Sequence, residues 1–152
     1  MPRSRLCLQL MPANSPILSD KDLLFGYKQI VLYFENEVRK SKTGFNKRLL
    51  KGFLDNNHIV ITTSSNVEKN YQEFIGKKRK AFIYFSQKDY DIPMLIRLLR
   101  NAFAHGHIKK EKIGGHYYLL FFNQFNNVKT FAGQIPYSHF SAFIGALKGC
   151  RQ

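Results

Sequence analysis

The sequence predicts a mainly α-helical protein that carries a small β-hairpin insert before its last helix. Apolar residues recur at three- and four-residue steps over several stretches, which is the period of an amphipathic helix. A late stretch changes to short apolar runs on either side of two glycines, which is typical of a hairpin. The chain has 152 residues, 44% of them hydrophobic, which is enough for a packed core. We therefore expect a single domain over residues 20–152, preceded by an irregular, proline-containing lead-in over residues 1–19.

Three helices are expected in the first half of the chain. The first covers about residues 21–41, behind a Ser19-Asp20 N-cap. Residues 45–55 and 67–77 show similar apolar stripes, and Asn66 is the predicted N-cap of the latter helix. The stripe of the first helix repeats at steps of four, three, four and four residues and consists of Leu23, Tyr27, Ile30, Phe34 and Val38.

Two short apolar runs stay unassigned. Residues 59–61 are β-branched and fit either a strand or a buried turn of helix, because periodicity cannot separate the two in so short a run. Residues 81–85 are apolar and aromatic, and they are also too short to assign.

The best-defined helix begins after Asp91, a good N-cap, with Pro93 in its first turn. Its apolar stripe continues to Phe103, and Gly106 is the expected C-terminal stop. The hairpin then follows, with strands over residues 109–113 and 116–122. A third short strand is expected over residues 128–135, before a last helix that opens at Pro136 and Ser138 and turns Phe140, Phe143, Ile144 and Leu147 inward.

The charge of the chain points to a polyanionic partner. Lys and Arg number 24 against 10 Asp and Glu, which gives a net charge of +14. Nucleic acid is the commonest partner of so basic a protein. Four consecutive cations, Lys77, Lys78, Arg79 and Lys80, form either a solvated helix end or a patch that contacts RNA phosphates.

Other site classes have little support. The two cysteines, Cys7 and Cys150, form neither a disulfide framework nor a zinc spacing. The isolated His116 and His139 have no ligand spacing around them, and the carboxylates are scattered rather than paired. No run approaches the ~18 apolar residues of a membrane span. We expect a cytoplasmic protein with no metal, no cofactor and no membrane partner.

The segment with the clearest chemistry is Arg100-Asn101-Ala102-Phe103-Ala104-His105. It places a permanent cation and a titratable imidazole about one helical turn apart, at the end of the best-defined helix. Such a pair can hold a phosphate and move a proton beside it. Asn101 adds an amide that can bond a phosphate or the backbone.

With Leu99 and Gly106 at its ends, this segment resembles the signature of the HEPN superfamily (higher eukaryotes and prokaryotes nucleotide-binding domain). The signature is an Arg, a polar residue that is often Asn, and a His four to six residues after the Arg. The resemblance implies an α-helical bundle and a homodimer in which two copies of the motif meet in one cleft. It also implies a small metal-independent ribonuclease of a bacterial toxin or anti-phage defence system, with an antitoxin protein as a possible partner.

One position departs from a branch of that family. In the toxins that pair with a nucleotidyltransferase antitoxin, a Tyr follows the motif His by two residues, whereas this chain has His107. This departure argues against modification by such an antitoxin. His107 also fits the broader spacing from Arg100, so it is an alternative to His105 as the catalytic histidine.

The leading hypothesis is an endoribonuclease in which His105 removes the proton of the ribose 2′-OH and Arg100 stabilises the charge on the phosphate, with support from Asn101. A second hypothesis is a non-catalytic module that binds RNA or a nucleotide on the same fold. A third is a structural protein in which the pair only caps a helix.

Overall fold

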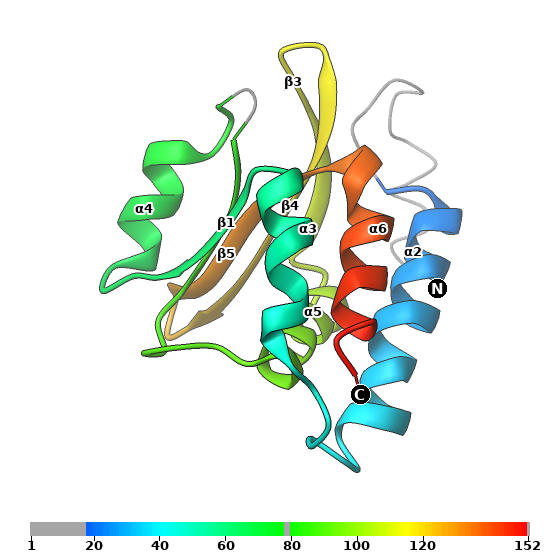
Figure 1. Ribbon diagram of the computed structural model, residues 1–152. Coiled ribbons are helices and arrows are strands. Elements are labelled where there is room, and N and C mark those ends of the chain that lie inside the picture. Colours follow the sequence, from blue (N-terminus) through cyan, green and yellow to red (C-terminus); the bar gives the residue numbers. More distant parts are fainter. Residues whose placement is uncertain (1–17, 78–79, 152) are drawn as a thin grey trace.

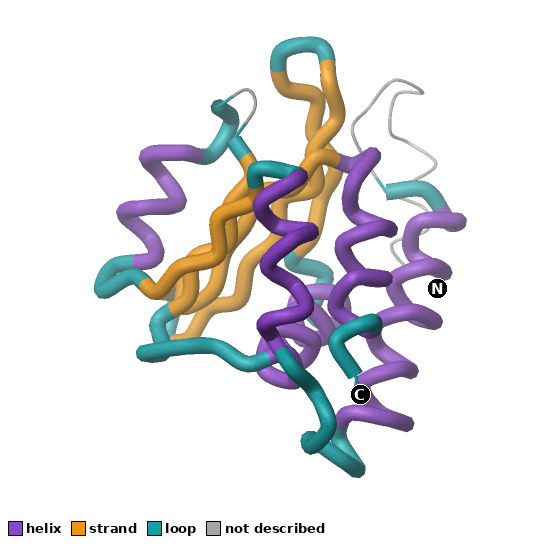
Figure 2. Tube along the Cα trace, viewed as in Figure 1, coloured by secondary structure: helices purple, strands orange, loops and turns teal. Residues whose placement is uncertain are grey.

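A five-stranded mixed sheet with helices on both faces forms the framework of the molecule (Figure 1). The computed structural model describes residues 18–77 and 80–151. The helix α4 lies alone on one side of the sheet, and the other helices gather on the opposite side (Figure 2). In chain order the elements are α2 (Asp20–Gly26), η1 (Tyr27–Val31), η2 (Phe34–Val38), η3 (Lys47–Leu50), α3 (Lys51–Asn56), β1 (Ile59–Thr63), α4 (Val67–Phe74), β2 (Ala81–Phe85), α5 (Ile92–Ala104), β3 (Ile108–Ile113), β4 (His116–Phe125), β5 (Val128–Pro136) and α6 (Tyr137–Lys148).

The strands lie in the order β1-β2-β5-β4-β3. Strands β1 and β2 are parallel and are joined by the α4 crossover, whereas the other neighbouring pairs are antiparallel. The predicted hairpin is present as β3 and β4, with Gly114 and Gly115 both at positive φ in its turn. The predicted third strand is β5, which lies between β4 and β2.

The prediction of a mainly α-helical bundle is wrong. Helices account for 47% of the described residues and strands for 28%, and the hairpin is the outer part of a continuous sheet rather than a small insert. The two unassigned runs are strands β1 and β2. Four of the five residues of β2 are buried, because helices cover both faces of this part of the sheet. Because a strand buried on both faces does not alternate between polar and apolar residues, its sequence pattern does not identify it as a strand.

The first helix begins at the predicted N-cap, where Ser19 and Asp22 form a capping box. From Tyr27 to Val38 most of its winding is π-helical, with hydrogen bonds from residue i to i+5. Because this turn is wider than the 3.6 residues of an α-helix, the four-residue steps of Ile30, Phe34 and Val38 stay on one buried stripe. The inward positions predicted for Leu23 and Tyr27 are wrong, since both side chains are exposed.

The helix α5 has the predicted ends. Asp91 Oδ1 accepts a 2.8 Å hydrogen bond from the Met94 amide, and Gly106 has a φ of +71° just beyond the last turn. Asn66 caps α4 as predicted, with a 3.0 Å bond from the Lys69 amide to its side chain. In α6, the predicted inner residues Phe140, Phe143, Ile144 and Leu147 are all buried.

A buried amide holds the chain after α4. Gln134 of β5 is fully buried, and its Oε1 accepts a 3.0 Å hydrogen bond from the Gly76 amide. Its Nε2 donates to the carbonyl oxygens of Lys77 and Lys80 at 3.0 and 2.9 Å. These three bonds fix both ends of the basic loop against the sheet. Within the part of the chain that the structure describes, no helix is long and apolar enough to cross a membrane.

Two predictions extend beyond the described residues. The predicted lead-in lies almost entirely in residues 1–17, which the structure does not describe. The same applies to Lys78 and Arg79 of the predicted phosphate patch.

The contact between the first helix and α5 predicts opposite effects for two helical glycines. A Cβ at Gly26 would come within 2.7 Å of three atoms of the Phe103 ring, whereas a Cβ at Gly52 would meet nothing within 4 Å. Gly26→Ala should therefore lower the free energy of unfolding by about 1–3 kcal/mol, through overpacking. Gly52→Ala, the matched control, should raise it by about 0.5–1 kcal/mol, through helix propensity. Chemical denaturation of the two variants measures both values, and equal stability of the two would contradict this account of the contact.

Candidate functional site

Arg100 is held by a carboxylate from a distant part of the chain. Its Nη2 donates a 2.6 Å hydrogen bond to Glu35 Oε2, within an ion pair. Its Nη1 donates to Asn101 Oδ1 at 3.0 Å, and the guanidinium carbon lies 5.8 Å from the centre of the Phe34 ring. The side chain is 30% exposed. Arg100 therefore has a fixed orientation and still reaches the surface.

The π-helical segment η2 supplies the partner of Arg100. Phe34 is buried on the inner stripe of this segment, and the next residue, Glu35, lies beside α5. Glu35 also accepts a 2.7 Å bond from Arg39 Nη1, one helical turn further on. The hydrogen bond from Arg39 and the positive charge of Arg100 hold the pKa of the Glu35 carboxyl below its usual range, although partial burial acts in the opposite direction.

Asn101 connects the two motif residues. It follows Arg100 directly and precedes His105 by four residues, so it shares a face of α5 with His105. The His105 amide donates a 3.0 Å bond to the Asn101 carbonyl oxygen, and His105 is the exposed C-cap of the helix. Between the side chains of Arg100 and His105 the described structure contains no hydrogen bond. Positions five residues apart do not share a helix face.

The two candidate histidines have different surroundings. The ring of His107 stacks on Phe122 of β4, with centroids 4.4 Å apart and planes inclined by 10°. Its Nδ1 is buried and has no hydrogen-bond partner among the described residues. The ring of His105 lies 5.9 Å from that of His107 and is open to solvent. His105 is thus free to meet a substrate, whereas His107 is part of a packed wall.

Of the predicted phosphate patch, Lys77 and Lys80 are described. They flank the loop that Gln134 holds, and Lys80 Nζ lies 5.7 Å from the centre of the Phe74 ring. Sequence reasoning missed cations closer to the motif. Arg97 lies one turn before Arg100 on α5, and with Lys42 and Phe34 it lines a hollow of about 250 Å³. The three-residue spacing of Arg97 and Arg100 was a readable signal, whereas nothing in the sequence pattern pointed to Glu35.

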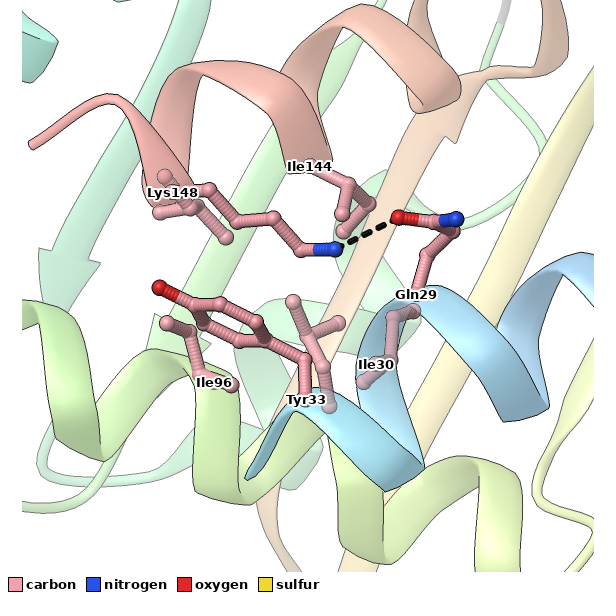
Figure 3. A pocket seen from close by; sticks show the side chains of 8 residues that line it. Gln29, Ile30, Tyr33, Ile96, Ile144 and Lys148 are labelled. Atoms are coloured by element: carbon pink, nitrogen blue, oxygen red, sulfur yellow. Dashed lines mark hydrogen bonds between the residues drawn. The ribbon is translucent and has the colours of Figure 1, made fainter. Parts of the chain in front are cut away.

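Two other hollows are less suited to RNA chemistry. The pocket between η1, α5 and α6 in Figure 3 holds only about 10 Å³, no more than one water. It is closed by Lys148, whose Nζ donates to Gln29 Oε1 at 2.6 Å above the Tyr33 ring. A cavity of about 340 Å³ between α2 and α6 has mainly apolar walls. Among residues 18–77 and 80–151, no three His, Cys, Asp or Glu side chains gather as metal ligands would.

The comparison with protein families gives one clear result. A family model described as HEPN pEK499 p136 matches residues 23–151, which is most of the chain and includes the whole of the motif. No curated protein and no solved structure matches the chain significantly.

The carboxyl of Glu35 provides a test of the site's electrostatics. An NMR titration should find its pKa below that of a free glutamate side chain, and both Arg39→Ala and Arg100→Ala should raise that pKa. Because the folded-state pKa is depressed, the stability from these ion pairs is present above the unfolded-state pKa of about 4.3 and is lost as the pH falls through the folded-state value. Arg48→Ala removes a cation that does not touch Glu35 and is the control. An unperturbed pKa in the wild-type protein would show that the two ion pairs do not form in solution.

Proposed function

The chain belongs to the HEPN pEK499 p136 family, and we propose that it is a metal-independent endoribonuclease with its site at the end of α5. Family membership is compatible with such an activity. The observation that carries the proposal is the coupling of Arg100, Asn101 and Glu35 on the last turns of α5, the helix whose C-cap is the exposed His105. This arrangement offers a fixed cation for a phosphate and an accessible imidazole for a proton.

The proposed reaction uses the nucleophile that RNA itself carries. His105 accepts the proton of a ribose 2′-OH, and the 2′-oxygen attacks the adjacent phosphorus. The bond from phosphorus to the 5′-oxygen of the next nucleotide breaks, which leaves a 2′,3′-cyclic phosphate and, after protonation, a 5′-hydroxyl. Arg100 stabilises the negative charge on the non-bridging oxygens as the phosphorus becomes five-coordinate.

The same site supports a second candidate, a non-catalytic module that binds RNA or a nucleotide. The ion pair of Arg100 with Glu35 favours this binding module, because a guanidinium that already holds a carboxylate has fewer donors left to stabilise the charge that develops during cleavage. An arginine has five N–H donors, and Glu35 and Asn101 accept from two of them in the structure. Of the other three donors, the Nε–H is buried without a partner among the described residues, so the two remaining Nη hydrogens are the ones that can bind a phosphate, with or without cleavage. Activity alone therefore separates the two candidates.

We further propose that the nuclease acts as a homodimer and serves as a toxin or an anti-phage defence effector. The reaction needs a base and an acid on opposite sides of the phosphorus, and one motif offers one exposed histidine. A two-fold axis that brings two copies of residues 100–107 together supplies both groups and joins two basic surfaces. A nuclease that needs no cofactor also requires restraint in its own cell, which an antitoxin that covers the cleft would provide.

The direct test is cleavage of RNA in the absence of free metal. The purified protein should cut RNA but not DNA in excess EDTA, and the products should carry 2′,3′-cyclic phosphate ends. His105→Ala should reduce the rate at least ~100-fold, the usual contribution of a general base, and should leave RNA binding intact. Arg100→Ala should weaken both cleavage and binding.

His116→Ala, at the exposed hairpin turn, is the matched control for the loss of a histidine. RNA binding without any cleavage by the wild-type protein would favour the binding module. Activity that depends on added magnesium would exclude the proposed mechanism. Normal cleavage by His105→Ala together with loss of activity in His107→Ala would transfer the proton-transfer role to His107.

The dimer makes a separate prediction. A mixture of Arg100→Ala and His105→Ala chains should recover part of the activity that each lacks alone, because heterodimers contain one site with complementary residues. Subunit exchange followed by the cleavage assay measures the recovery. A protein that sediments as a monomer and stays fully active at nanomolar concentration would rule out the shared site.

A further inference from the structure

A second recess lies beside the motif, on the sheet face that α4 covers only in part. It has a volume of about 340 Å³, and we refer to it as the α4 groove. One wall is α4 and the other is the start of β3, with β4 and β5 as the floor. The residues that matter below are Tyr71, His107, Lys109, Phe122 and Lys129.

The groove exists because α4 is short. This helix has eight residues and packs on β2 and β5, where Val67 and Tyr71 meet Phe82 and Ala132. In the strand register, Phe122 pairs with Ala132 and Lys109 pairs with Leu120, so these side chains share the α4 face of the sheet. The outer strands β3 and β4 extend beyond the helix and leave an aromatic strip open at its edge.

The walls combine flat rings with a partly buried cation. The rings of His107 and Phe122 are stacked, and Lys129 Nζ lies 4.7 Å from the centre of the Phe122 ring and 5.5 Å from that of Tyr71. The side chain of Lys129 is only 18% exposed. Rings and cations in this arrangement are what proteins use to hold the bases of single-stranded nucleic acids.

The charges in the groove favour a neutral ring over a phosphate. Lys129 is paired with Glu68 at 3.5 Å, and Lys109 with Glu111 at 4.0 Å. Each lysine thus has a carboxylate near it, so the groove has little excess of the positive charge that a phosphate site needs. A nucleobase needs a stacking surface and donors for its polar edge; the face of the His107 ring that is turned away from Phe122 supplies the first, and the ammonium groups of Lys109 and Lys129 supply the second.

The position and the volume of the groove indicate which part of an RNA it could hold. Gly106 and His107 line the groove, and they are the residues that directly follow His105. The volume lies at the lower end of the ~300–1,000 Å³ that small-molecule pockets typically have. We propose that the α4 groove binds one nucleobase of the RNA, that of a nucleotide next to the phosphate held at Arg100 and His105. This inference rests on the proposed function for the nature of the substrate.

The test separates a base contact from phosphate contacts. The probe is a 2′-O-methyl RNA oligonucleotide, which has no free 2′-OH and cannot be cleaved by the proposed route. A series of such probes carries a single abasic position that moves along the strand. With the wild-type protein, one abasic position should weaken binding roughly 10-fold, the usual worth of one stacked base, and the others should have little effect.

His107→Leu should remove the penalty at that one position, because the ring that stacks is gone, and His107→Phe should restore most of it. His116→Leu, which changes a histidine at the far end of the same hairpin, should leave the penalty unchanged. Circular dichroism of each variant checks that the sheet is intact. If no abasic position weakens binding, or if the penalty is the same in His107→Leu, the groove does not hold a base.

Failure of this inference and failure of the nuclease proposal are distinguishable. Binding of the uncleavable probe does not depend on catalysis, so the penalty would persist even if the protein cut no RNA. If the protein does cleave RNA, His107→Leu should raise KM several-fold with kcat largely retained, because a stacking residue acts on binding. Cleavage with an unchanged KM in His107→Leu would overturn the groove assignment and leave the nuclease proposal intact.

Discussion

Strand β5 fits closely between β2 and β4 at Gly133, which has no side chain. The helices packed on each face of the sheet depend on this close fit. A Cβ at Gly133 would come 2.6 Å from the ring of Phe121 and 2.8 Å from the Phe82 carbonyl oxygen. In a close-packed interior neither neighbour has room to retreat. On one face, Phe131 and Ile135 of β5 belong to the core that holds α5 and α6. On the other, Ala132 contacts α4 and Gln134 holds the loop after it. The motif helix and the α4 groove therefore take their positions from the same strand.

The elements that the sequence could predict are those whose ends carry capping or turn residues, or whose apolar residues repeat with a regular period. Asp91, Pro93 and Gly106 define the ends of α5 through local backbone chemistry, and two adjacent glycines define the hairpin turn. Strands β1 and β2 have no such marks. They are short apolar runs: β2 is buried on both faces, β1 is the edge strand beside it, and the pairing of β2 with β5 joins segments about 50 residues apart in the sequence. The sheet therefore depends on pairing between segments that are far apart in the sequence. When that pairing is not known, the hairpin resembles an insert in a helical bundle.

The candidate site also has residues that the sequence could predict and residues that it could not. The sequence could place Arg100, Asn101 and His105 together, because a single helix end carries all three. It could not supply Glu35, which lies 65 residues before Arg100 and reaches it through a π-helical turn that no apolar pattern predicted. The stacking of His107 on Phe122 was equally out of reach, because it depends on the register of β3 against β4. Spacing locates the groups that are proposed to carry the chemistry, and the tertiary fold decides which groups hold them in place.

The ion pair with Glu35 shapes how Arg100 can act in the proposed reaction. A carboxylate beside a guanidinium competes with a phosphate for the same cation, but it also limits the freedom of a long side chain that would otherwise lose rotamer entropy on binding. Glu35 takes an Nη2 donor, and Asn101 takes an Nη1 donor through its carbonyl oxygen. The amide nitrogen of Asn101 is then left to act as a donor on the face of α5 that it shares with His105. A polar residue directly after the arginine thus orients the cation through its side-chain carbonyl oxygen, and its backbone carbonyl accepts from the His105 amide.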